Sequence, residues 1–371
     1  MRDYFANSWK TYAGFGIAAI MLFAVAPAVL SDFRLSLLGK FLCFGIVAVG
    51  IGLAWGRGGM LTLGQGVFFG LGAYIMAMHL KIADAELRGD DVPDFMQIAG
   101  IRELPAYWQP FASPVVTILG IVLIPTFVAV LLGLGVFKRK VKGAYFAILS
   151  QALAAAFAIL LVGQQTIGGS NGLNRFRSFF GLALNDPVNR RLLFFIAAAT
   201  LLVVVAITRQ LMYSRYGELL VAVRDQEERV RFLGYDPANV KLVAYAVAAL
   251  FASIAGALFV PIVGIISPAD VGIVPSIAFL IGVAIGGRTT LLGPVLGAIA
   301  VAWAQTSLSE NFPSGWVYAQ GILFIVVVGF FPAGLAGLGA LLRRRRRPPA
   351  DPDSTRTTDV AVATTSTGVS S

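Results

Sequence analysis

Histidine, cysteine and charged residues are scarce in this chain of 371 residues. It has one cysteine, Cys43, and one histidine, His79, and both occur in apolar runs. A single cysteine excludes an intrachain disulfide, and no cluster of His, Cys or carboxylates has the spacing of metal ligands. The same scarcity excludes a Ser/His/Asp or Cys/His catalytic group. We expect His79 to be a packing or interfacial residue.

A phosphate-binding loop is also missing. The motif GxxxxGK[ST] has no match, because Gly39 and Lys40 lack the upstream glycine and the following hydroxyl residue. We therefore expect no catalytic residue, no bound cofactor and no nucleotide hydrolysis by this chain. The centres of the apolar runs hold no Asp, Glu, Lys or Arg, and Lys40 is expected to snorkel to the end of its run. This absence argues against proton coupling, although sodium-coupled carriers can use backbone carbonyls instead.

Long apolar runs dominate what is present. The chain is 57% hydrophobic and 13% charged, with a mean hydropathy of +0.81, whereas soluble domains are about one quarter charged. Repeated apolar runs of about twenty residues predict an all-α polytopic membrane protein. The net charge of +10 lies mainly in short loops and at one terminus. It therefore predicts topology signals and contact with membrane lipid, and no nucleic-acid binding.

We predict ten transmembrane helices in a domain of residues 1–342, followed by a basic, disordered cytoplasmic tail over residues 343–371. The eighth predicted span is too short to cross alone unless Pro268–Val274 helps, so a re-entrant helix is the alternative. The ten expected spans are Tyr12–Leu30, Leu35–Trp55, Met60–Leu80, Pro114–Phe137, Gly143–Val162, Arg191–Ile207, Lys241–Ile266, Pro275–Gly287, Leu291–Leu308 and Trp316–Phe331.

The distribution of basic residues predicts the orientation. The arginine run Arg343–Arg347 should be cytoplasmic, which with ten spans also places the N-terminus in the cytoplasm. The acidic segment Lys81–Ser113 then lies outside. The segment Gly163–Arg190 is also predicted to lie outside, although its arginines do not fit the rule.

The segment Tyr216–Tyr235 is dense with charge and lies between two apolar runs on the predicted cytoplasmic side. Its pattern predicts a short amphipathic helix that ends at Gly234. Such a helix is either a solvated connector or an element that docks into a groove on a soluble partner. The predicted apolar face is Leu219, Val223, Val230 and Leu233, and the predicted i,i+4 ion pairs are Arg224–Glu228, Asp225–Arg229 and Glu227–Arg231.

Neutral polar side chains remain inside the predicted spans. Amide and hydroxyl groups can hydrogen-bond a small uncharged solute, and they can equally hydrogen-bond neighbouring helices. We select Gln65, Gln151 and Gln305 as candidate substrate-pathway residues. Small glycine pairs at i,i+4 predict close helix contacts at Gly52–Gly56, Gly66–Gly70, Gly282–Gly286 and Gly293–Gly297.

Two segments resemble a known family. The stretch from Gly217 through the following apolar run resembles the cytoplasmic loop of permease subunits of branched-chain amino acid ABC importers, a LivM-like family. Gly217, Ala222, Arg224 and Gly234 match its pattern, and Val230 replaces the usual alanine. The segment Gly286–Ala298 resembles a second family motif, with Arg288 and Thr289 replacing small residues. Within this family, residues 55–80, 143–165 and 231–245 look most like the urea ABC permeases of the UrtC type.

The resemblance implies a multi-pass permease of the bacterial inner membrane. It would work with a homologous second permease subunit, two cytoplasmic ABC ATPase subunits that use ATP, and a periplasmic solute-binding protein. Residues 209–240 would form the ATPase-coupling segment, with Gly217, Glu218, Ala222, Arg224, Asp225, Glu228 and Gly234 as its coupling residues. The expected substrate is urea; a branched-chain amino acid or a short amide is the alternative. A stand-alone channel or secondary carrier is the alternative of another class.

Overall fold

The computed structural model describes residues 13–141 and 143–311, with seven further positions between 315 and 326. This part of the chain is mostly helical, as the sequence predicts, and its strands are only two residues long. Strand β1 (Leu173–Asn174) pairs antiparallel with β4 (Ile265–Ile266), and β2 (Ser178–Phe179) pairs antiparallel with β3 (Leu182–Ala183).

Some of the helices begin at residues that favour a helix start. Three long helices start with proline in the first turn, where the missing N–H costs no hydrogen bond. Asp186 and Asp236 cap two of them by accepting the backbone N–H of Val188 and of Ala238, both at 3.0 Å. The helices are α2 (Ala26–Val29), α3 (Asp32–Ile51), α4 (Gln65–Glu86), α5 (Asp94–Ile98), α6 (Pro114–Phe137), α7 (Ala144–Gly163), α8 (Pro187–Tyr213), α9 (Arg215–Phe232), α10 (Pro237–Val263), α11 (Ile273–Gly286) and α12 (Gly293–Asn311), with π-helices η1 (Met21–Val25) and η2 (Gly52–Arg57) and 3-10 turns η3 (Gln109–Ala112), η4 (Gln165–Ile167), η5 (Gly169–Asn171) and η6 (Pro268–Asp270).

Seven of the described helices are long and apolar enough to cross a membrane. They correspond to the second to eighth predicted spans, and the structure thus bears out those seven. The first predicted span contains a shorter apolar helix, Ala13–Val29, and the ninth corresponds to α12. The tenth predicted span and the tail of residues 343–371 lie outside the described residues, so the count of ten stays a prediction.

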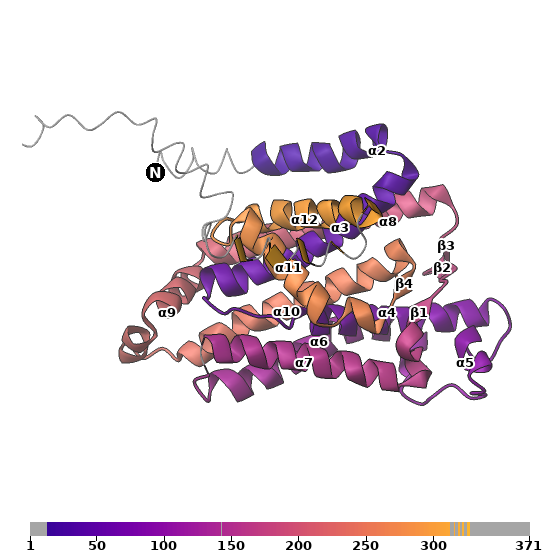
Figure 1. Cartoon of the computed structure of the whole chain (residues 1–371), viewed down its shortest axis with the longest axis horizontal. Helices are drawn as coiled ribbons and strands as arrows, with labels where there is room; N and C mark the ends of the chain where they lie inside the picture. Colours follow the sequence, from indigo (N-terminus) through magenta and orange to yellow (C-terminus); the bar gives the residue numbers. More distant parts are fainter. Residues whose placement is uncertain are drawn as a thin grey trace, which may run out of the picture.

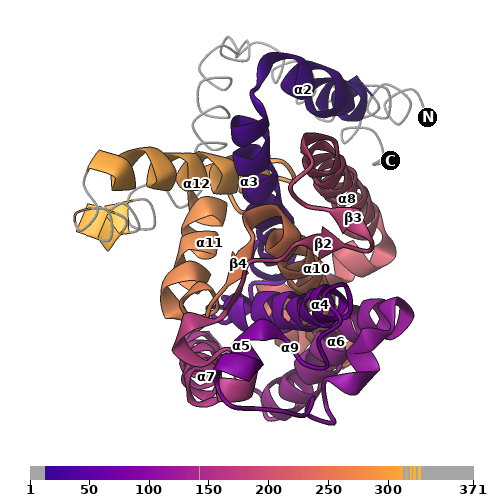
Figure 2. The ribbon, with the colours of Figure 1, turned by 90° about the vertical axis from the view of Figure 1, so that its right-hand side faces the viewer.

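Helices α3, α4 and α10 form the centre of the bundle. The most apolar stretch of α4 is 89% buried and that of α3 78%, whereas those of α6 and α7 are only 28% buried. Figure 2 looks along the bundle and shows α10 between α3 and α4, with α6 and α7 at one side. Because α6 and α7 expose large apolar side chains such as Phe127 and Ile159, their outer faces suit contact with lipid.

The two ends of the bundle differ. Helix α9 lies at one end, and α5 and the short strands lie at the other (Figure 1). At the strand end Asp84 is buried and accepts hydrogen bonds from the backbone of Arg177 and Ser178 at 2.8 and 3.0 Å. The predicted outer segments Lys81–Ser113 and Gly163–Arg190 therefore lie at the same end, as the ten-span topology expects. His79 is buried there as a packing residue, with Nδ1 2.8 Å from the carbonyl oxygen of Phe111.

All four predicted glycine pairs lie at close contacts with other parts of the chain. In α11 and α12 they face one another, because a Cβ on Gly286 would overlap the backbone of Gly293 and a Cβ on Gly297 would overlap that of Gly282. The pair in η2 contacts Pro294 and the backbone of Arg288, and the pair in α4 contacts Val271. Small residues thus let these backbones approach closely.

Several predicted span boundaries were wrong, and two of them bear on the interior of the bundle. The third span does not begin at Met60, because Met60–Gly64 is irregular and α4 starts only at Gln65. The eighth span is longer than Pro275–Gly287, because Pro268–Asp270 adds a turn and the segment Pro268–Gly286 reaches 19 residues. The capping box of Ser267 and Asp270 fixes this extra turn.

The α11–α12 contact generates a stability prediction. Substituting Gly297→Val inserts side-chain atoms where the backbone of Gly282 already lies, so we expect a loss of about 1–3 kcal/mol of unfolding free energy. Thermal unfolding of the purified protein in detergent measures this. The control is Gly135→Val, because no atom beyond the backbone of its own helix turn and its chain neighbours lies within 4 Å of a Cβ at Gly135. Equal unfolding temperatures for the two variants would contradict the proposed close contact.

Candidate functional site

Helix α9 packs its apolar side onto the bundle. Leu220, Val223 and Val230 are at most 3% exposed, and Leu219 is half-buried. Leu233 was wrongly predicted to share this face and is 75% exposed. Leu233 is the C-cap of α9 (φ −80°, ψ 1°) and follows its last helical residue, so it leaves this face. The helix also has a kink at Gln226, whose backbone is non-helical (φ −149°, ψ 75°). Gly234 follows the C-cap with φ +87° and ends the helix as predicted.

The kink at Gln226 also changes the ion pairs of α9. The predicted pair Glu227–Arg231 is present at 2.8 Å. The other two predicted pairs are wrong within the described residues, because both would span the kink. Arg224 instead pairs with the neighbouring Asp225 at 2.7 Å. The hydrogen bond from Arg224 holds the pKa of Asp225 below its ordinary value.

Arg224 connects α9 to the end of η2, the π-helix that continues α3. Its Nη1 donates a 2.8 Å hydrogen bond to the carbonyl oxygen of Gly56, which lies in the last turn of η2, where carbonyls lack helical partners. The aliphatic part of Arg224 packs over Gly59, where a Cβ would come within 2.6 Å of its Cγ. Since Gly59 also has φ +68°, only glycine suits this position. Arg224 thus holds the turn Gly56–Gly59 against α9.

The other predicted coupling residues differ in exposure. Gly217 is buried against the backbone of Leu211 and Met212, where a Cβ would overlap. Glu218, Ala222, Asp225 and Glu228 are exposed on α9. Beyond them lies an apolar tip formed by three exposed side chains: Phe232 (90% exposed), Leu233 (75%) and Tyr235 (55%).

The irregular segment Met60–Gly64, here called the break, follows the turn held by Arg224. Ser150 Oγ accepts the N–H of Leu63 at 3.0 Å, and Ser276 Oγ accepts the N–H of Gly66 at 3.1 Å. Ser150 is the seventh residue of α7, so at 1.5 Å per residue the break lies about 9 Å inside the helical layer. In an apolar layer, irregular backbone is stable only where protein or a cavity satisfies it.

Two buried polar side chains at the break lack partners. Thr62 and Gln65 are each 1% exposed, yet Thr62 Oγ1 and both amide atoms of Gln65 have no hydrogen-bond partner in the described part of the chain. Each such group costs about 1–3 kcal/mol when left unsatisfied. A small solute or water that bonds to them would remove this cost.

A cavity of about 320 Å³ lies beside the break, next to α9. Gly58–Leu61, Val223 and Arg224 line it, together with the ion pair Glu227–Lys241 at 2.8 Å. The break therefore has open space on one side.

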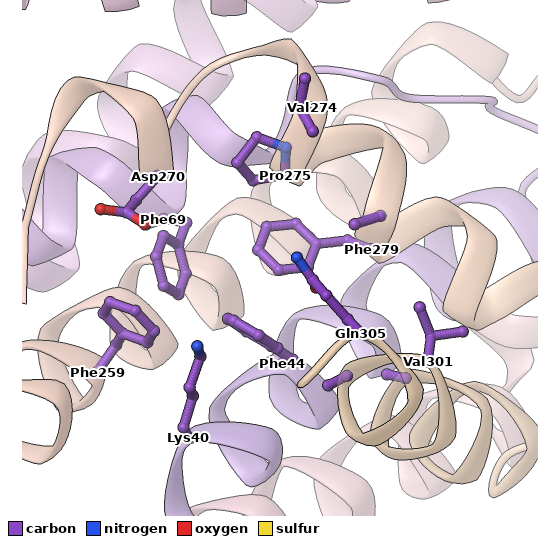
Figure 3. A pocket seen from close by; sticks show the side chains of 13 residues that line it. Lys40, Phe44, Phe69, Phe259, Asp270, Val274, Pro275, Phe279, Val301 and Gln305 are labelled. Carbon is purple, nitrogen blue, oxygen red and sulfur yellow. The ribbon is translucent and has the colours of Figure 1, made fainter. Parts of the chain in front are cut away.

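A second cavity, here called the Lys40 cavity, lies between α3, α4, α10, α11 and α12 and has a volume of about 120 Å³. Figure 3 shows Lys40, Asp270 and Gln305 pointing into it among phenylalanine rings. Gln305 was selected from the sequence, whereas Gln65 and Gln151 do not line this cavity. The structure thus does not bring the three selected glutamines together in this cavity.

Sequence reasoning missed Lys40 and Asp270. Helix α3 begins at Asp32 rather than at Leu35, so Lys40 lies two turns inside the helix. The expectation that Lys40 snorkels to the end of its helix was therefore wrong. Asp270 lies in the short polar stretch before α11. The sequence signal that could have identified Asp270 as a site residue was an acidic side chain in so short a polar stretch between two apolar runs.

Comparisons with known proteins identify relatives of this chain. Two curated relatives, the high-affinity branched-chain amino acid transport system permease proteins LivM of Escherichia coli (strain K12) and Salmonella typhimurium (strain LT2), are each 26% identical to this chain. The alignments cover 345 and 347 residues, in each case 86% of this chain and 74% of the relative. No solved structure matches.

A sequence model of the family described as "Branched-chain amino acid transport system / permease component" matches residues 33–331. This match includes α3 to α12, and therefore the break, the Lys40 cavity and α9. The chain belongs to the branched-chain amino acid transport system permease family and is a multi-pass membrane protein.

Proposed function

We propose that this chain is the membrane-spanning permease subunit of an ATP-driven ABC importer and forms part of the path for a small polar solute. The observation that carries the proposal is the link from α9 through Arg224 to the turn Gly56–Gly59 and onward to the break. A helix at the surface is thereby joined to buried, partly unsatisfied polar groups at Thr62 and Gln65. Through such a link, a movement of a partner protein at α9 can shift residues inside the membrane layer.

The outer side of α9 suits a soluble partner. The apolar tip of Phe232, Leu233 and Tyr235 is exposed beside the carboxylates of α9. An aromatic anchor that fills a groove, with charges that fix its orientation, is a common way for a helix to dock. We assign this surface to contact with one of two cytoplasmic ABC ATPase subunits, with Glu218, Ala222, Asp225 and Glu228 around the contact.

The remaining partners follow from the family. A homologous second permease subunit would complete the path, and a periplasmic solute-binding protein would deliver the solute. ATP is used by the ATPase subunits. Basic residues gather at the α9 end, including Arg57, Lys138 and Arg288, which supports a cytoplasmic position for this end in a bacterial inner membrane. With the ten-span topology, we propose that both termini are cytoplasmic as well.

The substrate has two candidates. Both relatives are named for branched-chain amino acid transport. The Lys40 cavity offers both a lysine and a carboxylate beside apolar walls, which favours an amino acid. Urea is the second candidate. It is supported by the unpartnered amide of Gln65 and by the likeness to the urea permeases.

The Arg224 link generates the first functional prediction. Substituting Arg224→Glu removes the hydrogen bond to Gly56 and reverses the charge, and a hydrogen bond from a charged group is worth about 1.5–3 kcal/mol. We expect ATP-dependent uptake to fall by roughly tenfold or more while membrane insertion is unchanged. Uptake by membrane vesicles that contain the complete importer measures this.

The matched control is Arg139→Glu. Arg139 is an exposed basic residue that follows α6 at the same end of the bundle, so its charge reversal changes the local charge equally without touching Gly56. We expect its uptake to stay within about twofold of the parent. Equal uptake by Arg224→Glu and the parent would rule out the coupling role of Arg224.

A reconstitution experiment separates an importer subunit from a self-sufficient carrier. Liposomes that contain only this chain should show no uptake of leucine or urea, and uptake should begin when the second permease, the ATPases, the binding protein and ATP are added. Flux through the chain alone would establish a channel or secondary carrier instead.

Competition identifies the substrate in the same system. If an amino acid is the substrate, excess leucine abolishes uptake of labelled leucine and urea does not. Uptake of labelled urea that excess leucine does not reduce would establish the urea candidate.

A further inference from the structure

Two opposite charges face the Lys40 cavity without pairing. Lys40 reaches it from α3, and Asp270 reaches it from the capped turn η6. No ion pair within 4.0 Å joins them, although nine other ion pairs between described residues meet this criterion. Both side chains point toward the same space (Figure 3).

Each of the two groups is oriented but incompletely satisfied. Asp270 Oδ2 accepts hydrogen bonds from the N–H and the hydroxyl of Ser267 at 2.9 and 2.7 Å. These bonds fix the carboxylate, and no residue in the described ranges bonds to its other oxygen. The ammonium of Lys40 lies 5.8 Å from the centre of the Phe44 ring, a cation–π contact, and has no hydrogen-bond acceptor among the described residues.

Apart from Gln305, the other residues that line the cavity are apolar. Four phenylalanines line it, and Val274, Pro275 and Val301 add aliphatic surface. Its volume of about 120 Å³ is several times the roughly 10–15 Å³ that one water molecule needs. The cavity therefore has room for a small organic solute with an apolar part. The four rings belong to Phe44, Phe69, Phe259 and Phe279.

We propose that the Lys40 cavity is a binding site for a zwitterionic amino acid, in which Lys40 contacts the carboxylate, Asp270 contacts the ammonium, and the phenylalanine rings contact an aliphatic side chain. Gln305 adds an amide that can hydrogen-bond the carboxylate. Because a solute of this kind brings one charge of each sign, it satisfies both protein groups at once. Urea carries no charge and would leave both unpaired. The proposal rests on the proposed import function and names the substrate class of that path.

The simplest alternative is that Lys40 and Asp270 only balance each other's charge across the cavity. The two explanations differ in what they expect of a double substitution. Removing one partner of a balancing pair leaves an uncompensated charge, and removing both restores neutrality. Removing both contacts of a bound zwitterion cannot restore binding. The double variant therefore distinguishes a ligand site from a structural pair.

The experiment uses the complete importer in proteoliposomes, supplied with leucine-loaded binding protein at saturating concentration. Uptake of labelled leucine and ATP hydrolysis are measured for Lys40→Met, Asp270→Asn and the double variant. We expect each single variant to lose roughly tenfold or more of its uptake, the size expected for one lost charge-assisted hydrogen bond, and the double variant to lose at least as much. ATP hydrolysis should stay within about twofold of the parent, because the coupling end is unchanged.

Asp32→Asn is the matched control. Asp32 lies at the start of the same helix and pairs with Arg191 at 2.8 Å on the surface, so its loss removes one charge and one ion pair outside the cavity. We expect its uptake to stay within about twofold of the parent. If Lys40→Met does not assemble, the same measurement is made on Lys40→Gln, which keeps a polar side chain at this position.

The outcomes separate this site from the import function. Recovery of leucine uptake in the double variant, or uptake within twofold of the parent in both single variants, overturns the zwitterion site and leaves the import function standing. A parent importer that takes up urea and no leucine would likewise overturn the zwitterion site and leave the import function standing. A parent complex that imports neither solute with ATP contradicts the import function itself.

Discussion

Buried backbone that is not helical needs a partner for each of its polar groups, and this constraint organises the centre of the protein. The break of Met60–Gly64 lies inside the helical layer, and serines of α7 and α11 accept the N–H groups of Leu63 and Gly66. The two serines come from helices far apart in the sequence, so the break and the first turn of α4 take this form only when both helices are in place. The start of α4, the position of Gln65 and the closeness of α11 all depend on these hydrogen bonds.

The same region explains why one end of the bundle can influence its interior. Arg224 bonds to Gly56 and packs over Gly59, so α9 and the turn before the break form one contact unit. The break also borders the cavity next to α9 that Arg224 helps to line, which leaves it room to shift. The serine hydrogen bonds are few and replaceable by water, whereas the glycine contacts between α11 and α12 allow little movement. Movement of α9 is therefore expected to act on the break before it separates those helices.

Much of the fold could be predicted from the sequence, because long apolar runs, proline starts and glycine stops are local signals. They gave seven spans, the helix α9 and its end at Gly234, and the close glycine contacts. The late start of α4, the kink at Gln226 and the cavity position of Lys40 depend on tertiary contacts, which a single sequence does not display. The missed charges show this most clearly: Lys40 was read as an end residue because the start of α3 was placed three residues late, and the role of Asp270 depends on which helices surround it.

The central claim is that α9 and the turn Gly56–Gly59 move together and thereby change the break. The most direct measurement is the structure of the complete importer by electron cryo-microscopy, with and without bound nucleotide. We expect the 2.8 Å hydrogen bond between Arg224 and Gly56 to persist in both states. The hydrogen bonds that Ser150 and Ser276 accept from Leu63 and Gly66 should rearrange. A break that stays unchanged while α9 moves away from Gly56 would contradict the account.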